Sequence, residues 1–284
     1  MPGVFKKTLN RITALVFTMT IIVIFDTANH GQSQRIGKLP TYPFSPGEKI
    51  SYKVNYSIFT VGKAEVILSP VIYKMAGKKY YRLDINGKTA GAAHLVTEVN
   101  DNWGALLDTT SLLSHRSWRN LAEGRYRRRE FVDYDHVNGK LNVNVIDNNT
   151  GRLKEPKLYE IKHSPTHDMI SGYLWLRMIN YENLEKGDTI QVYGFLEDTF
   201  YDLKILYMGK EEINTRLGSI MTHKLVPIMP KNGLFSGENS IIAWLSADEL
   251  RIPVRIHAKM FIGHVGCEIT GVEGTRMYPD FIED

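Results

Sequence analysis

The feature that most constrains the fold is an alternation of apolar and polar side chains at every second position. In the stretch KISYKVNYSIF, apolar and aromatic residues recur in this way from Ile50 to Ile58. Successive side chains of a β-strand point to opposite faces, so this pattern directs one face of a strand toward a core. Strand-like segments of this kind follow one another through most of the chain. We therefore expect a mainly β protein.

Short turns separate these segments. Asn138-Gly139 stands between two alternating segments, which is a strong hairpin signal, and the sequence DNNTG at 147–151 closes the next segment. Turns this short join antiparallel strands, whereas parallel strands need a crossover between them. The pattern predicts curved antiparallel sheets that form an open barrel or a sandwich.

One segment has a helical period instead. In THDMISGYLWLRMINYEN, apolar residues fall three and four positions apart, and Thr166 or Asp168 is available as an N-cap. This predicts one central helix over 168–181. The segment EKGDTIQVYGF after it echoes PGEKISYKVNY, which suggests two similar meanders, 47–163 and 185–276, joined by the helix. The alternative is that any two strands begun by a Gly-acid turn look alike.

The N-terminus has the organisation of a secretory signal peptide. Lys6, Lys7 and Arg11 precede an apolar run from Ile12 to Phe25, which is short for a membrane span. We expect a signal peptide over 1–28, with an uncleaved anchor as the alternative, and export to the periplasm or the outer-membrane periphery. A linker over 29–46, a β-rich domain over 47–276 and a tail over 277–284 would follow.

Charge and cysteine content narrow the function further. Cleavage after Ala28 removes three cations and one acid, so the formal net charge of +4 becomes +2. This balance gives no reason to expect a nucleic-acid partner. Cys267 is the only cysteine, which excludes an intrachain disulfide, so stability must come from burial.

Candidate metal and nucleophile residues are few. His163 and His167 are spaced as metal ligands on a helix would be, but Pro165 between them disfavours a helical His163. A loop histidine beside a helix cap is the preferred interpretation, and we expect no metal and no cofactor. Cys267 is expected to be a small strand residue, because no basic partner is fixed beside it.

The densest basic stretch is RSWRNLAEGRYRRRE at 116–130. Guanidinium groups suit bidentate contact with phosphate, which an exported protein meets on lipid headgroups and cell-surface glycans. A solvated strand face balanced by nearby acids is the alternative. The candidate residues are Arg116, Trp118, Arg125 and Arg127.

A second basic row is expected near the C-terminus. In RIPVRIHAKMFIG, apolar and basic residues alternate, which predicts that Arg251, Arg255, His257 and Lys259 share the outer face of a strand. The preceding SADE is expected to be a turn in which Ser246 and Asp248 bind local backbone.

Three longer stretches resemble a known family. They are GEKISYKVNYSIFTVGKAEVIL, THDMISGYLWLR and IAWLSADELRIPVRIHAKMFIGHVGCEITG, which together span Gly47 to Gly271. They resemble exported proteins of Gram-negative bacteria that carry the domain of unknown function numbered 3108. The resemblance implies export and a β-rich domain but supplies no catalytic residues. The closing pattern also looks like periplasmic lipoprotein-carrier domains, in which a curved sheet wraps an apolar cavity.

The first functional hypothesis is a non-catalytic cell-envelope protein that binds or carries an amphipathic or anionic ligand such as a lipid, glycolipid or glycan. The expected ligand-binding residues are Arg116, Trp118, Arg125, Arg127, Trp175, Trp244, Arg251, Arg255 and His257.

Two other classes stay open. An enzyme acting on cell-wall or surface polysaccharide would need a converging carboxylate pair, such as Asp248 with Glu249 or Asp101 with Asp108. Acid-base pairs of Ser246 with Asp248, or of Asp101 with His94 or His115, are weaker candidates. A scaffold would instead bind other envelope proteins through an exposed sheet edge.

Overall fold

The structure is a computed structural model, and it describes residues 37–91, 93, 97–228, 240–260 and 263–282. The expected signal peptide over 1–28 and residues 29–36 of the expected linker lie outside the described residues.

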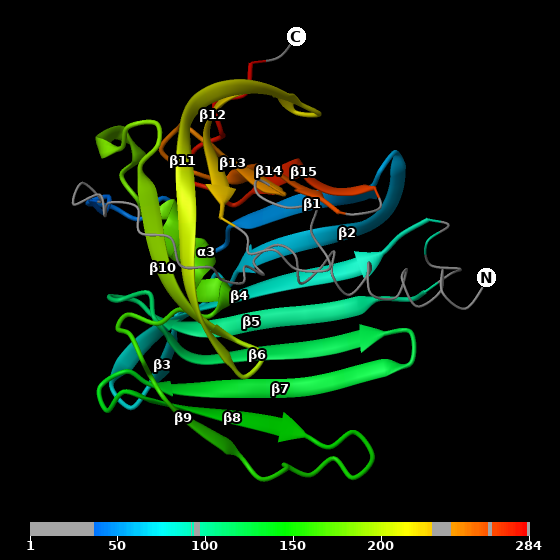
Figure 1. Cartoon of the computed structure of the whole chain (residues 1–284), viewed down its shortest axis with the longest axis vertical. Helices are drawn as coiled ribbons and strands as arrows, with labels where there is room; N and C mark the ends of the chain where they lie inside the picture. Colours follow the sequence, from blue (N-terminus) through cyan, green and yellow to red (C-terminus); the bar gives the residue numbers. More distant parts are fainter. Residues whose placement is uncertain (1–36, 92, 94–96, 229–239, 261–262, 283–284) are drawn as a thin grey trace.

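Alternating apolar residues form long strands, as the sequence predicts. Every strand in the described part of the chain belongs to one 15-stranded antiparallel sheet, and the paired strands run side by side in Figure 1. The strands are β1 (Lys49–Tyr56), β2 (Phe59–Leu68), β3 (Tyr73–Met75), β4 (Lys78–Thr89), β5 (Asn100–Asp108), β6 (Ser114–Glu123), β7 (Tyr126–Asp135), β8 (Lys140–Ile146), β9 (Lys157–Glu160), β10 (Thr189–Leu196), β11 (Thr199–Thr215), β12 (Gly218–Pro227), β13 (Ile241–Ser246), β14 (Pro253–Lys259) and β15 (His264–Glu273).

Two meanders make up the sheet. The first runs from β1 to β9 and the second from β10 to β15, and they are joined where β15 pairs with β1. Gly47 and Gly187, with φ of 96° and 103°, turn the chain into β1 and β10, so the echo in the sequence marks the first strand of each meander. The predicted fold class is confirmed in the form of an open barrel, because a single sheet excludes the sandwich alternative.

The sheet does not close by hydrogen bonds, because β9 and β10 are its two ends. The chain at His167 pairs with β10 instead. The His167 N–H donates to Tyr193 O, and the Phe195 N–H donates to His167 O, both at 2.8 Å. Side chains fill the remaining gap, where Phe195 packs with Tyr134 and Leu141 of the first meander. The barrel is therefore closed by packing on this side.

The central helix is shorter than the sequence suggests. Helix α3 covers Met169–Arg177, and a short 3₁₀ helix, η1, follows at Tyr181–Asn183. Asp168 is the N-cap, and its side chain together with Ser171 forms a capping box. The helix contacts β5, β6 and β10, and Ile170 and Leu174 are buried in the main core. No helix among the described residues has the length and apolarity needed to cross a membrane.

The sheet has an inner face, which carries the buried core and contacts α3, and an outer face. On β5 and β6, Asp101, Trp103 and Arg119 are buried on the inner face, while Asn102 and Asn120 belong to the outer face. The predicted hairpin at Asn138-Gly139 is confirmed between β7 and β8. This division into two faces decides where each candidate residue lies.

Candidate functional site

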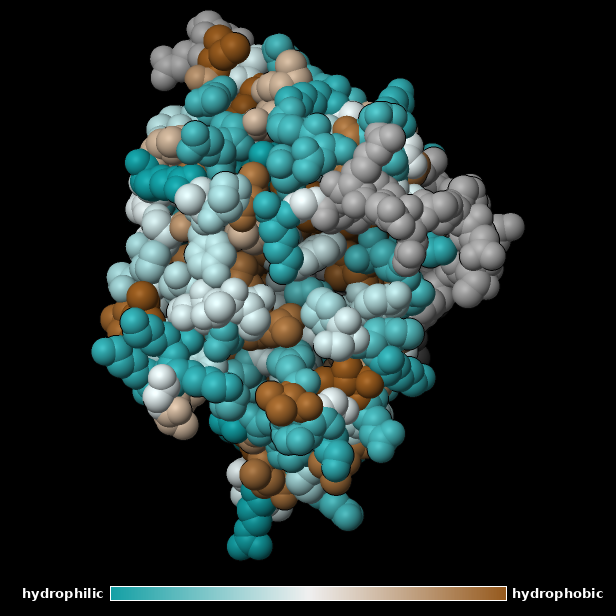
Figure 2. Space-filling view, turned by 90° about the vertical axis from the view of Figure 1, so that its left-hand side faces the viewer, coloured by the Kyte–Doolittle hydropathy of each residue, from teal (hydrophilic) through white to brown (hydrophobic). Residues whose placement is uncertain are grey.

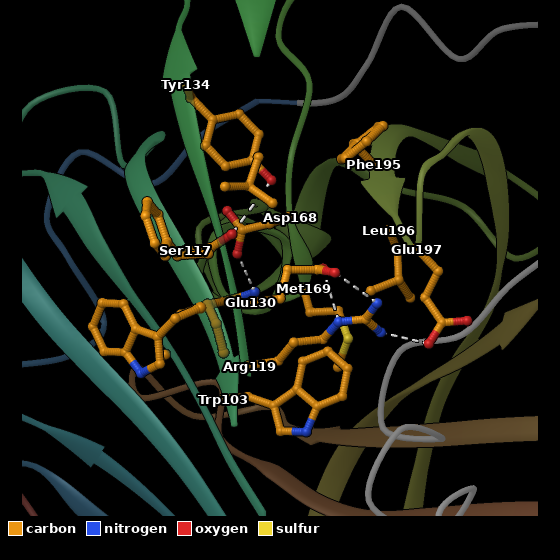
Figure 3. A pocket seen from close by; sticks show the side chains of 15 residues that line it. Trp103, Ser117, Arg119, Glu130, Tyr134, Asp168, Met169, Phe195, Leu196 and Glu197 are labelled. Carbon is orange, nitrogen blue, oxygen red and sulfur yellow. Dashed lines mark hydrogen bonds and ion pairs between the residues drawn. The ribbon is translucent and has the colours of Figure 1, made fainter. Parts of the chain in front are cut away.

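The inner face holds a buried charge cluster that sequence reasoning missed. Arg119 on β6 donates to Glu130 on β7 at 2.9 Å and to Glu197 at the tip of the β10–β11 hairpin at 2.5 Å. Arg119 and Glu130 are each 6% exposed, whereas the Glu197 side chain is 52% exposed. Burial alone would lower the pKa of Arg119, but the carboxylates of Glu130 and Glu197 have a larger effect and raise it. The cluster ties the two meanders together (Figure 3).

A cavity of about 30 Å³ adjoins this cluster. Its walls come from β5, β6, β7, the start of α3 and the β10–β11 hairpin, whose side chains point toward one another in Figure 3. A space of this size accommodates about one or two water molecules and no acyl chain. Beneath the helix itself, Ile170, Tyr173 and Leu174 pack into the main hydrophobic core.

A carboxyl pair lies on the same inner face. Asp101 on β5 and Glu123 on β6 are 1% and 7% exposed, and Asp101 Oδ2 and Glu123 Oε1 have no hydrogen-bond partner among the described residues. A carboxylate buried without a partner is costly when ionised, which favours the neutral form. Burial, and then the charge of Asp101, raises the pKa of Glu123 to about 8. With this pKa, Glu123 is mainly protonated at neutral pH, and neither carboxyl lines the cavity beside Arg119.

Of the predicted binding residues, Arg116 and Trp118 lie together on the outer face of β6. The Arg116 guanidinium pairs with Asp133 and sits 4.5 Å from the Phe131 ring centre. The Trp118 indole lies over the backbone of Gly104 and donates from Nε1 to Asn102 at 2.8 Å. Arg116 therefore already has a carboxylate partner, as the alternative of a balanced strand face predicts.

Arg125 and Arg127 lie elsewhere, at the turn between β6 and β7. Both are exposed. Arg127 donates to Gly124 O at 2.7 Å and to Tyr126 O at 2.8 Å. This turn is at the opposite end of β6 from Arg116, so the basic stretch is not one continuous site.

Trp244, Arg255 and His257 share the outer face of β13 and β14. Trp244 is directly opposite Arg255 in the register, and Arg255 pairs with Glu268 on β15 at 2.8 Å. The Trp244 indole donates to Glu211 at 2.5 Å. These side chains form a row of their own, separate from Arg116 and Trp118.

The expectation that Arg251 belongs to this outer row is wrong. Arg251 precedes β14 with φ of 48°, and it is only 6% exposed. Its guanidinium donates to Nε2 of His223 at 3.0 Å and lies 5.5 Å from the ring centre of Tyr181. The turn at 247–250 breaks the alternation that the sequence suggests, because Asp248 accepts from the backbone N–H groups of Leu250 and Arg251.

Trp175 lies on α3, with its ring centre 5.6 Å from that of His167 and its side chain packed against the β10–β11 core. The nine predicted residues thus fall in four separate places: β6, the β6–β7 turn, β13–β14 and the region around α3 and Arg251. The structure does not bring them together as one site.

The histidine pair does not converge on a metal. His163 stacks on Tyr193 at 4.2 Å, while His167 is buried with Nδ1 3.2 Å from Ser171 Oγ. Burial lowers the pKa of His167 to about 4. No group of three or more metal-ligating side chains occurs within the described part of the chain. Burial raises the pKa of the Cys267 thiol to about 12, which makes it a poor nucleophile.

The carboxylate pairs considered from the sequence do not form a catalytic pair. Asp101 is the second residue of β5 and Asp108 is its last, about 23 Å apart along the strand. Asp248 accepts from Ser246 Oγ at 2.6 Å in the predicted turn, and Glu249 beside it is exposed. His94 lies outside the described residues, and His115 is on the outer face, away from Asp101.

A row of three lysines on the outer face was also missed. Lys53 on β1 is directly opposite Lys63 on β2, which is directly opposite Lys88 on β4. With Arg216 they line an open hollow of about 800 Å³, whose one acid among the described residues, Glu65, pairs with Lys49 at 3.1 Å. Alternation places each lysine on an outer face, but only the register between strands aligns them.

A second open hollow, of about 780 Å³, lies at the other end of the outer face. Its charged residues are of both signs, and Arg116 there pairs with Asp133. Its cations are Lys78, Arg116 and Lys140, and its acids are Asp108, Asp133 and Asp135. This hollow therefore has no excess of positive charge, unlike the lysine row.

Solved structures with a similar fold are distant in sequence. A β-barrel-like protein of the domain of unknown function DUF1849 from Brucella abortus is 8% identical, with a TM-score of 0.52 over 81% of this chain and 98% of that chain. Two further matches have lower TM-scores of 0.31: a candidate exported protein with a YmcC-like fold from Bacteroides fragilis (8% identical, over 82% of this chain and 100% of that chain) and a candidate lipoprotein from Parabacteroides distasonis (10%, 82% and 99%).

No curated protein is similar enough in sequence to count as a relative of this chain. Residues 51–270, in contrast, match a protein family, and they cover nearly the whole of the stretch from Gly47 to Gly271 in which the resemblance was found. The chain therefore belongs to the DUF3108 family of proteins of unknown function.

Proposed function

We propose that this protein is an exported, non-catalytic binding protein of the bacterial cell envelope. Its ligand is anionic and amphipathic, of the lipid or glycolipid class, and binds on the outer face of the open barrel. The observation that carries this proposal is the hollow lined by Lys53, Lys63, Lys88 and Arg216. None of these four cations has a carboxylate partner among the described residues, so an anion would supply the missing charge.

The contrast between interior and surface supports an external site. The cavity beneath α3 measures about 30 Å³, whereas the cationic hollow measures about 800 Å³. Pockets that hold drug-sized ligands are usually about 300–1,000 Å³. A carrier that encloses its lipid inside the sheet would need a far larger space than the one beneath the helix.

The arrangement of the carboxylates favours binding over catalysis. Glycoside hydrolysis needs two carboxyl groups about 5–9 Å apart on either side of an open site. The Asp101 and Glu123 carboxyls are both buried, and Asp101 also accepts from Ala122 N–H at 2.8 Å. Two carboxyls buried to this extent are not exposed to a sugar.

Native mass spectrometry of the gently purified full chain tests the proposal. After incubation with phosphatidylglycerol or an anionic glycolipid, we expect a complex with one ligand bound, which dissociates as ionic strength rises. Phosphatidylcholine, which has no net charge, is the matched control and should leave the free protein. A clean mass of the free protein after each anionic ligand would contradict the proposal.

A further inference from the structure

We propose that the lysine row and the tip of the β1–β2 hairpin together dock this protein on an anionic phospholipid bilayer. The inference rests on the proposed function and names its partner as a membrane surface. The lysine row is Lys53, Lys63 and Lys88, and the hairpin tip is Ile58 and Phe59.

Without a bound anion, repulsion among the three lysines of the row lowers the stability of the fold. Lys53, Lys63 and Lys88 are directly opposite one another on three adjacent strands, which lie about 4.8 Å apart. Like charges in directly opposite positions destabilise a sheet. At the two ends of the row, Lys53 is opposite Glu268 on β15, and Lys88 is opposite Asn100 on β5. Glu268 is already paired with Arg255, and Asn100 is neutral. An array of phosphate groups would relieve the repulsion among the three lysines.

The hairpin tip supplies the apolar part of a membrane contact. Ile58 is 87% exposed and Phe59 is 66% exposed. Phe59 is directly opposite Tyr56. Tyr56 is three residues from Lys53 along β1, a separation of about 10 Å. Proteins that bind at a membrane interface combine apolar side chains, which enter the acyl boundary, with lysines that meet anionic headgroups. A small free anion would use the lysines but not the exposed Ile58 and Phe59.

The β6–β7 turn lies at the same end of the sheet as this tip (Figure 1). It carries the exposed cations Arg125 and Arg127 around Tyr126, which is 51% exposed. Tyrosine is enriched at membrane–water interfaces. The two turns would therefore face the bilayer together, with cations behind their apolar tips.

The opposite end of the barrel has a different surface. In Figure 2, which shows the side at the left of Figure 1, hydrophobic residues are scattered among hydrophilic ones. The hollow of about 780 Å³ at that end carries balanced charges. Charge complementarity thus selects the end with the β1–β2 tip.

Vesicle co-sedimentation of the full chain tests the inference. Vesicles of phosphatidylcholine with 30% phosphatidylglycerol are compared with pure phosphatidylcholine. We expect each of K53Q, K63Q and K88Q to lower partitioning onto the anionic vesicles about fivefold. The matched control is K74Q/K79Q, because Lys74 and Lys79 are also directly opposite each other but do not line the cationic hollow. Every variant keeps the same N-terminus, so differences between variants report the row.

The hairpin tip has its own variants. I58S/F59S should weaken binding at least tenfold, because less apolar area enters the bilayer. V137S is the matched control, since Val137 is 89% exposed at the tip of the β7–β8 turn. If either set of variants binds anionic vesicles as well as the unchanged protein does, the docking surface is overturned.

Binding of anions that are not part of a bilayer distinguishes this inference from the proposed function. Tripolyphosphate should compete with the anionic vesicles for the lysine row. If the protein binds dispersed phosphatidylglycerol but not vesicles, the membrane inference is overturned and the proposed function stands. If it binds no anionic lipid in any form, both are overturned, even where tripolyphosphate binds.

Discussion

Arg177 on α3 and Glu48 at the start of β1 form a buried ion pair, with Nη2 3.0 Å from Oε2, although 129 residues separate them in the sequence. The two side chains are 0% and 2% exposed. Arg177 also donates to Leu250 O at 2.9 Å and to Pro43 O at 2.9 Å. One guanidinium therefore fixes the helix to the N-terminal segment and to the turn before β14.

Removing this cation should be strongly destabilising. R177M leaves the carboxylate of Glu48 buried without a partner, which costs about 3–5 kcal/mol. The free energy of unfolding, measured in urea by tryptophan fluorescence, should fall by that amount. The matched control is R116M, whose partner Asp133 is 34% exposed, with an expected loss below about 1 kcal/mol. Equal losses for the two variants would mean that the burial of the Arg177 pair does not matter.

The carboxyl pair makes stability depend on pH. Glu123 has its pKa raised from 4.5 to about 8 in the folded protein, so the folded chain holds this proton more tightly than the unfolded chain. As pH rises from 4.5 to about 8, the unfolded chain loses the proton first, and folding becomes less favourable by a few kcal/mol. E123Q keeps a neutral hydrogen-bonding group and should remove this slope. An unchanged slope in E123Q between pH 5 and pH 8 would contradict the raised pKa of Glu123.

His223 makes stability depend on pH in the opposite direction, because its titration lowers the free energy of unfolding as pH falls. Burial, and then the charge of Arg251, lowers its pKa from 6.5 to about 3, and its Nε2 accepts from Arg251. As pH falls below 6.5, the unfolded chain binds a proton that the folded protein does not take up until about pH 3, so stability falls. H223Q should flatten this acid limb in urea titrations at pH 4 and pH 6.5. H115Q, at an exposed histidine, is the control that should leave it unchanged.

The fold was predictable because its signals are local, whereas the sites depend on the register. Alternation at Ile50, the hairpin at Asn138-Gly139 and the Asp168 cap are each readable within a few residues, and all three are confirmed. The alignment of Lys63 with Lys88 is not readable in this way, because it depends on which strands pair and at what offset.

At Arg251, a local sequence pattern was readable but gave a wrong prediction. Its place in an alternating pattern predicts an outward side chain, but the turn formed by Asp248 delays the strand until Pro253 and leaves Arg251 buried. Arg177 was recognised as part of a helix, yet nothing near it in the sequence indicates that Glu48 is its partner. Pairings over such separations follow from the packed sheet alone.

The contact between Gly104 and Trp118 gives a test of the outer face. A Cβ at Gly104 would lie 2.3 Å from Cζ2 of Trp118, so the indole must move in G104A and its hydrogen bond to Asn102 must change. Overpacking of this kind costs about 1–3 kcal/mol. We expect that loss in urea unfolding, together with a shift in tryptophan emission as the ring becomes more exposed.

Two comparisons make this test specific. G266A adds the same methyl group on β15, where a Cβ would have nothing within 4 Å, and should cost much less. In W118A the indole is absent, so adding G104A to it should cost little more, because the clash no longer exists. If G104A costs as much in the W118A background as in the unchanged chain, the strain comes from the strand backbone, and the close stacking of Trp118 on Gly104 is not what requires glycine there.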